Sequence, residues 1–335
     1  MSFSLNYVGN HGSDLSVLNP GLNAYCNAAC AAALGVTSFA GLPSAIPDPR
    51  FSTVTEAGNN GISNYNGVTA SFTRNMSQSF QLQASFTWSH ALDDISNGGF
   101  LPFSLDTNTS ILAPQNPYNL RQYNYGNADY DSRKYGTVSY VWHTPRLQNK
   151  ALDILADWVV SGTLFAHSGY PFTAFDGTST SALASYNYGP ALGLDLFSNT
   201  SVGPLTCSSS NVFNNFKATP ACMTSAQFTS PIISGGIGTF GNERRNQIYG
   251  PSYFDTDLTV MKSFRIRWEG AEFQIGAQAF NILNHPNFDQ PVADPGNPQF
   301  GYTIRTVSTP TSIFGSFLGA DASPRALQIR AQLTF

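Results

Sequence analysis

Charged side chains are scarce in this sequence. Asp, Glu, Lys and Arg make up 11% of its 335 residues, whereas they account for roughly a quarter of a soluble globular protein. The chain therefore has little charge with which to cover a surface in water. Its formal net charge of −4 is spread thinly and forms no basic stripe, which excludes nucleic acid as a partner.

Long hydrophobic runs are also missing. The longest apolar run lies near Ala28–Val36, far short of the roughly 20 residues that a membrane helix needs. The first residues, MSFSLNYVGNHG, have neither the basic nor the apolar region of a signal peptide. An exported protein would need an export signal upstream of Met1, so we expect the chain to be a fragment of a longer protein.

Catalytic and metal-binding motifs are absent from the sequence as well. The five histidines are scattered, with no i,i+2 or i,i+4 pair among them, and no Gly-x-Ser-x-Gly or phosphate-binding glycine loop occurs. Asp93 and Asp94 are adjacent, and adjacent carboxylates on a strand point to opposite faces, which disfavours a joint acid–base role. We expect no enzyme, no metal site and no cofactor.

The four cysteines form two local pairs, Cys26 with Cys30 and Cys207 with Cys222. Each pair lies in a stretch rich in Gly, Ser, Asn and Pro. Local pairs in loops favour two disulfides in an oxidising compartment. A zinc site lacks a second pair of ligands nearby, and four free thiols remain the alternative for a cytosolic protein.

The C-terminal segment shows a strict two-residue pattern. Apolar residues alternate with polar ones from Leu327 to Phe335. Since side chains of a β-strand point to opposite sides in turn, this segment predicts a strand with one apolar and one polar face. It is long enough to cross a bilayer obliquely, and it ends on an aromatic residue.

Seven further segments share this pattern with different clarity. The clearest is Phe80–His90, and in Asp157–His167 the sequence does not decide which parity faces outward. The remaining predicted strands are Ser2–Val8, Tyr65–Arg74, Arg133–Thr144, Asp255–Arg265 and Ala271–Ile282.

The polar positions of these segments are mostly Gln, Ser, Thr and Asn rather than Lys, Glu and Arg. Neutral hydrogen-bonding side chains are typical of the lumen of a membrane barrel, and small apolar residues suit a wall that faces lipid. Aromatic residues at the ends of the apolar stripes are expected in the two interfacial girdles. The candidates for these girdles are Phe80, Trp88, Tyr140 and Trp142.

The connections between the predicted strands alternate between short and long. The short ones are Asn75–Ser79, Pro145–Ala156 and Ile266–Gly270; the long ones are Gly9–Asn64, Ala91–Ser132, Ser168–Phe254 and Leu283–Pro324. Outer-membrane barrels have tight periplasmic turns and long outer loops. The pattern thus predicts an antiparallel, all-β transmembrane barrel with every long loop outside and Phe335 at the periplasmic end.

Several longer segments resemble the Oar-like TonB-dependent receptors of the outer membrane. They are Ser63–Arg74 with Phe80–Asp94 (SNYNGVTASFTRN and FQLQASFTWSHALDD), Trp158–Phe172 (WVVSGTLFAHSGYPF), Gly241–Phe264 and Phe273–Phe288 (FQIGAQAFNILNHPNF). They occur in the order found in the family and together extend over nearly the whole chain.

The resemblance implies a C-terminal barrel segment, residues 1–335, that supplies about eight of roughly 22 strands. The family's plug domain and TonB box are absent from this sequence. The implied partners are outer-membrane lipid, the missing strands and plug, the TonB complex, and an unknown solute. Phe335 resembles the signal that the barrel assembly machinery recognises.

Two other functions fit parts of the pattern. Eight strands can form a small closed barrel, an adhesin or structural anchor, whose interior is filled with side chains. Alternation alone also fits a secreted β-sandwich with long surface loops that acts as an interaction module.

Two loop segments carry local predictions. Asn281, Asn284 and Pro286 follow a predicted strand, where Asn and Pro redirect the backbone, and the adjacent His285 is expected to share this structural role rather than bind a ligand. Arg244 and Arg245, next to Glu243, are predicted to form a solvated loop cluster.

Overall fold

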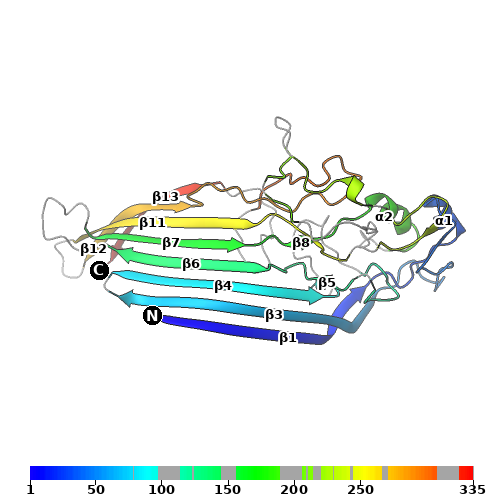
Figure 1. Ribbon diagram of the computed structural model, residues 1–335, viewed down its shortest axis with the longest axis horizontal. Helices are drawn as coiled ribbons and strands as arrows, with labels where there is room; N and C mark the ends of the chain where they lie inside the picture. Colours follow the sequence, from blue (N-terminus) through cyan, green and yellow to red (C-terminus); the bar gives the residue numbers. More distant parts are fainter. Residues whose placement is uncertain are drawn as a thin grey trace.

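The computed structural model is dominated by one long antiparallel sheet (Figure 1). The structure describes residues 1–77, 79–96, 114–122, 124–144, 156–188, 206–208, 210–213, 220–228, 230–241, 244–265, 271–307 and 324–334.

Eight long strands follow one another across the sheet in the order β1-β3-β4-β6-β7-β11-β12-β13, and short β5 (Gly126–Asn127) pairs with the end of β4. The eight are β1 (Ser2–Asn19), β3 (Glu56–Ser77), β4 (Phe80–Asp93), β6 (Lys134–His143), β7 (Trp158–His167), β11 (Tyr253–Arg265), β12 (Glu272–Phe280) and β13 (Ala326–Thr334). Each is antiparallel to its neighbour. The eight predicted strands therefore form a single up-and-down sheet.

The sheet is not closed. In the part of the chain that the structure describes, β1 and β13 are its two edges and do not pair with each other. This arrangement is consistent with a piece of a larger barrel, as predicted.

Two strands are longer than their alternation predicts. β1 continues to Asn19 instead of ending near Val8, and β3 begins at Glu56 instead of Tyr65. The added residues include Gly12, which pairs with Ser63, and Gly61, which pairs with Leu15, and register shifts interrupt the ladder there. Lipid imposes no apolar alternation on strands that extend beyond the bilayer, so the sequence pattern stops before the strand does.

The strand register aligns the apolar residues on one face of the whole sheet. Leu82 of β4 lies opposite Tyr140 of β6, and Tyr140 lies opposite Gly162 of β7. Residues directly opposite each other point to the same side. The apolar face of β7 is therefore Trp158, Val160, Gly162, Leu164 and Ala166, which settles the parity that its sequence leaves open.

The two ends of the sheet differ (Figure 1). One end carries the tight connection from β3 to β4. The other carries the described parts of four long connections, residues 20–55, 94–133, 168–252 and 281–325, here called the first to fourth long loops. They contain α1 (Ala28–Ala33), β2 (Ser38–Phe39), β8 (Pro171–Phe172), α2 (Gly177–Ala184), η3 (Ser225–Gln227), β9 (Ile237–Gly238) and β10 (Ile248–Tyr249).

The described parts of the long loops pack on one another and form a body that we call the loop cap. One apolar cluster joins the first and third long loops through residues such as Phe39, Tyr188 and Phe240. A second joins the third and fourth through residues such as Phe172 and Phe300. The third long loop belongs to both clusters and is the hub of the cap.

The helices in the cap are short and locally capped. Asn27 accepts a hydrogen bond from the Cys30 N–H at the start of α1, and Asp176 accepts from Thr178 and Ser179 at the start of α2. Such caps satisfy backbone donors in the first turn, which have no acceptor within any α-helix. No helix among the described residues is long and apolar enough to cross a membrane.

Candidate functional site

The apolar face carries the aromatic residues predicted for the girdles. Phe80 and Trp142 lie directly opposite each other at the short-turn end, and Tyr140 lies two residues from Trp142 on the same face. Trp88, at the other end of the β4 stripe, has 63% of its surface exposed. Exposure of this size on a continuous apolar face is the property of a surface that lipid covers.

Two basic side chains lie among the aromatic residues at the short-turn end. The Arg74 guanidinium lies over the Phe80 ring at 5.4 Å, and the Lys262 ammonium lies 5.6 Å from the Trp158 ring centroid. Aromatic and basic side chains together suit a membrane interface, where the rings meet the acyl chains and the charges meet the headgroups. Phe335, the predicted assembly signal, lies outside the described residues.

The opposite face of the sheet is a polar wall with few charges. Thr69 of β3 and Thr87 of β4 are hydrogen-bonded through their hydroxyls at 2.9 Å, and Ser85 and Thr137 are joined at 2.8 Å. These cross-strand pairs satisfy hydroxyls that point away from the apolar face. The sheet thus has the two faces that a barrel wall needs, one for lipid and one for a wet interior.

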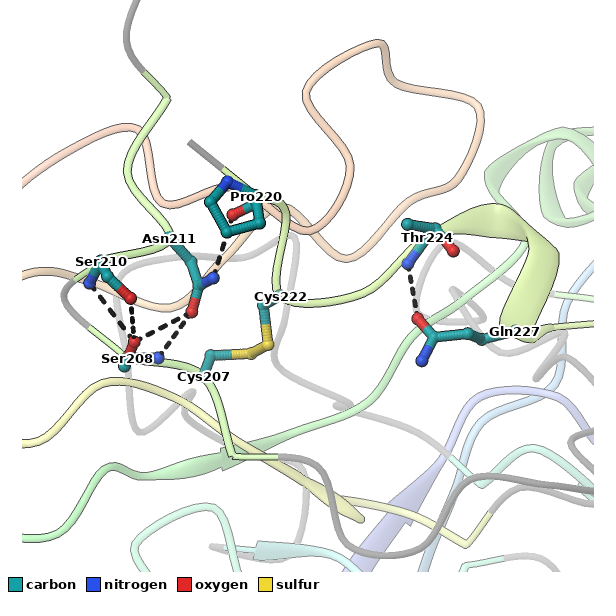
Figure 2. Close-up of a disulfide and its surroundings, with 8 residues drawn as sticks. All are labelled: Cys207, Ser208, Ser210, Asn211, Pro220, Cys222, Thr224 and Gln227. Carbon is teal, nitrogen blue, oxygen red and sulfur yellow. Dashed lines mark hydrogen bonds between the residues drawn. A yellow bond between two sulfur atoms is a disulfide. The ribbon is translucent and has the colours of Figure 1, made fainter. Parts of the chain in front are cut away.

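Two disulfides lie in the loop cap. Cys26 and Cys30 are joined within the first long loop, and Cys207 and Cys222 within the third, with Cα–Cα distances of 5.1 and 5.2 Å. Figure 2 shows the second disulfide beside Asn211, which donates a hydrogen bond to the Pro220 carbonyl at 3.0 Å. The cross-link and this hydrogen bond hold two parts of the third long loop side by side.

Arg245 is buried at the base of the loop cap, with only 1% of its side chain exposed. Its guanidinium forms ion pairs with Asp93, the last residue of β4, and with Asp129 of the second long loop, the latter at 3.0 Å. Its Nε also donates to the Asn124 carbonyl at 2.9 Å. The prediction of a solvated Arg244–Arg245 cluster is therefore wrong for Arg245, although Arg244 is exposed.

The neighbours of Arg245 extend this buried polar network. Asn246 donates to the Asp129 carboxylate at 2.7 Å, and its own N–H donates to the Thr173 hydroxyl at 2.7 Å. The network thereby connects β4 and the second long loop to both ends of the third. Gly126 is required for this approach, because a Cβ atom there would collide with the Arg245 carbonyl oxygen.

Burial shifts the titration of the paired charges. It raises the pKa of Asp129 to about 6, and it lowers the pKa of Arg245 to about 9. Both shifts have the same cause, which is that burial penalises the charged form of each group. The ion pair and the surrounding hydrogen bonds offset part of that cost.

The adjacent carboxylates Asp93 and Asp94 have separate partners. Asp94 accepts a hydrogen bond from the Ile62 N–H of β3 at 3.0 Å, while Asp93 pairs with Arg245. Each of the two carboxylates therefore has its own partner in a different part of the fold. Among the described residues, no group of three or more His, Cys, Asp or Glu side chains could hold a metal ion.

The segment after β12 turns the chain as its sequence predicts. Asn281 and Asn284 have φ values of 45° and 51°, in the left-handed region that Asn tolerates better than most residues. The Asn281 side chain also accepts a hydrogen bond from the His285 N–H at 2.9 Å. The prediction that Asn281 and Asn284 redirect the backbone here is confirmed.

The comparison with protein families agrees with the two-faced sheet. The model of the outer membrane beta barrel domain matches residues 1–328. Among solved structures, the outer membrane transporter YddB from Escherichia coli has 11% sequence identity and a TM-score of 0.44, over 98% of this chain and 30% of that chain. This chain therefore spans less than a third of that transporter's length.

A comparison with the curated proteins gives no match. The family model matches nearly the full length of the chain, and the sheet has the faces and loop asymmetry of a membrane barrel. The protein lies in the outer membrane, with the loop cap on the outer side and the short turns toward the periplasm. The chain belongs to the family of outer membrane β-barrel domains.

Proposed function

We propose that this chain is the C-terminal barrel segment of an Oar-like TonB-dependent receptor, in which the loop cap takes part in binding a solute for uptake. The plug and the remaining strands would come from other parts of the complete receptor. In this proposal the segment has no catalytic role, and the TonB complex supplies the energy for uptake.

The observation that carries the proposal is the open sheet. β1 and β13 are unpaired with each other in the described part of the chain. Every backbone polar group must be paired within lipid, so both edges need partner strands. A larger barrel supplies them at both edges and leaves a lumen wide enough for a solute.

The loop cap supports a binding role. Its loops are held by disulfides, apolar clusters and a buried ion-pair network rather than by local contacts alone. An ordered assembly of loops at the outer end gives a rigid surface on which side chains can select a ligand.

A small closed barrel, acting as an adhesin or anchor, is the competing proposal. It predicts that β1 and β13 pair directly. Three double-cysteine variants would test this pairing. Each combines Leu5→Cys in β1 with one change in β13: Leu327→Cys, Ile329→Cys or Ala331→Cys. A disulfide can form only between Cα atoms within about 7 Å, so a cross-link requires the two strands to be neighbours. The native cysteines among the described residues are all paired and would not interfere.

In outer membranes that contain the full-length receptor, our proposal predicts no cross-link in any of the three variants. A cross-link in one of them would establish a closed eight-stranded barrel and exclude transport through it. Capture of the periplasmic domain of TonB by the purified full-length receptor, and loss of capture when the TonB box is deleted, would then test energy coupling.

A further inference from the structure

An aromatic row crosses three neighbouring strands on the polar wall. Tyr135 of β6 lies directly opposite His167 of β7, which lies directly opposite Tyr253 of β11. Phe165 lies two residues from His167 on the same face of β7, and Tyr170 follows that strand. The row is therefore on the inner side of the barrel wall, just below the loop cap.

The rings contact one another and form a continuous surface. His167 stacks on Tyr253 with a centroid distance of 5.1 Å and an interplanar angle of 2°, and its centroid is 4.7 Å from that of Tyr170. Phe165 packs edge-on against Tyr135 at 5.0 Å and against Tyr253 at 5.6 Å. We call these five residues the aromatic platform.

The platform has a buried layer and an accessible layer. Tyr253 and His167 are only 4% and 6% exposed, whereas Tyr135 is 38% exposed, and Phe165 and Tyr170 are half-buried. The buried rings therefore hold the accessible ones in place. A ring fixed by its neighbours loses little conformational entropy when a ligand stacks on it.

The surroundings of the platform are polar but carry few charges. Thr137 and Thr163 continue the same face toward the periplasm on β6 and β7. On β11 the same face carries Asp257, whose carboxylate accepts a hydrogen bond from the Asn281 N–H at 3.0 Å, and Asp255, which is only 6% exposed. Hydroxyls and carboxylates of this kind can exchange hydrogen bonds with a ligand that carries many hydroxyl groups. Two carboxylates beside the rings disfavour an anionic ligand.

We propose that the aromatic platform is a binding site for a neutral oligosaccharide on its way through the barrel. The apolar faces of sugar rings would stack on Tyr135, Phe165 and Tyr170, and the neighbouring threonine hydroxyls and the Asp257 carboxylate would bind the sugar hydroxyls. This inference rests on the proposed transport function and assigns its substrate class.

The packing of the rings favours a sugar over a cation. A cation is bound best when aromatic faces surround it and leave a space between them. Here the centroids lie within 5.7 Å of their nearest neighbours, so the rings fill that space with each other. A flat ligand can stack on the surface of such a wall, whereas an ammonium group finds no cage in it.

Titration calorimetry on the full-length receptor in detergent would test the proposal with maltohexaose, cellohexaose and chitohexaose as probes. We expect at least one of them to bind, and Tyr135→Ala to weaken that binding about tenfold, which corresponds to ~1.4 kcal/mol. Tyr135→Phe keeps the ring and should restore most of the affinity. Tyr140→Ala on the same strand faces lipid and should leave binding unchanged.

Tyr170→Ala, which lies outside the long strands, provides a second test that does not depend on the folding of a strand variant; it should also weaken binding. Absence of binding by all three oligosaccharides would overturn the proposal. So would unchanged affinity in both Tyr135→Ala and Tyr170→Ala, or binding of hexalysine that is lost in Tyr135→Ala. TonB capture by the same preparations reports separately on the transport function, which could stand even if the sugar site does not.

Discussion

The sheet and the loop cap are built on different principles. The sheet repeats one simple rule, an apolar residue on one face and a neutral polar residue on the other, over eight strands. The cap depends on single contacts between distant residues, such as those of Arg245 with Asp93 and Asp129. We therefore expect the membrane wall to tolerate many substitutions that keep the pattern, and the cap to be sensitive to the loss of a few residues such as Arg245.

The largest effect is expected from Arg245→Ala. This change leaves Asp93 and Asp129 buried without their partner, and breaking a buried ion pair in this way costs about 3–5 kcal/mol. The cap should become sensitive to trypsin while the sheet keeps the heat-modifiable gel mobility of a folded barrel. Arg244→Ala removes the exposed neighbour and serves as the matched control. If Arg245→Ala leaves proteolysis unchanged, the network does not hold the cap.

A comparison of Leu164→Arg with Thr163→Arg tests the orientation of β7. Leu164 is on the lipid face and Thr163 on the inner face. An arginine facing lipid costs about 2–4 kcal/mol near the middle of the bilayer, whereas the lumen accepts charge. Urea unfolding in lipid vesicles should therefore show a large decrease in the free energy of unfolding for Leu164→Arg and a small decrease for Thr163→Arg. The reverse order would invert the assigned faces.

Removal of the disulfides should affect the cap in proportion to the loop that each one closes. Cys207 and Cys222 are 15 residues apart and Cys26 and Cys30 only 4, and a 15-residue loop is worth about 3 kcal/mol in the chain-entropy model. Replacing Cys207 and Cys222 by serine should speed proteolysis of the cap more than replacing Cys26 and Cys30. If both replacements speed proteolysis equally, the length of the loop that each disulfide closes does not explain how it stabilises the cap.

The smallest effect is expected from pH. Asp129 has a pKa of about 6 in the folded cap, against 3.8 ordinarily. The folded cap thus binds more protons between these values, so this residue stabilises the cap as pH falls and the contribution is lost as pH rises through 6. Asp129→Asn should reduce the difference between the thermal unfolding temperatures measured at pH 5 and at pH 7.5. If this temperature difference is the same in Asp129→Asn, groups other than Asp129 cause the pH dependence of stability.

The fold was predictable because its signal is local. Each strand carries its own alternation, as in Phe80–His90, and the alternation of short and long connections gives the direction of every strand. Contact with lipid on one face constrains each strand separately, so the pattern can be recognised without knowing which strands are neighbours. The extensions of β1 and β3 beyond the bilayer lack that constraint, so the sequence pattern does not predict them.

The residues of the cap and the platform were predicted poorly for the opposite reason. Arg245 looks like a surface residue in its own segment, because its partner Asp93 is 152 residues away. Tyr135 shares its parity with Thr137 and Ser139, and an aromatic residue among polar ones was the signal that could have suggested the platform. Its partners on β7 and β11 became evident only from the strand register.

The sequence by itself determined the all-β class, the membrane setting, the order of the strands and the end that carries the long loops. These features are encoded locally, because one face of each strand contacts lipid and the other contacts water, and this requires apolar and polar residues to alternate along the strand. The tertiary structure alone decided the parity of β7, the burial of Arg245 and the meeting of five aromatic residues on one wall. Those features depend on which strand lies beside which, and pairing across a sheet brings together residues that no local pattern connects.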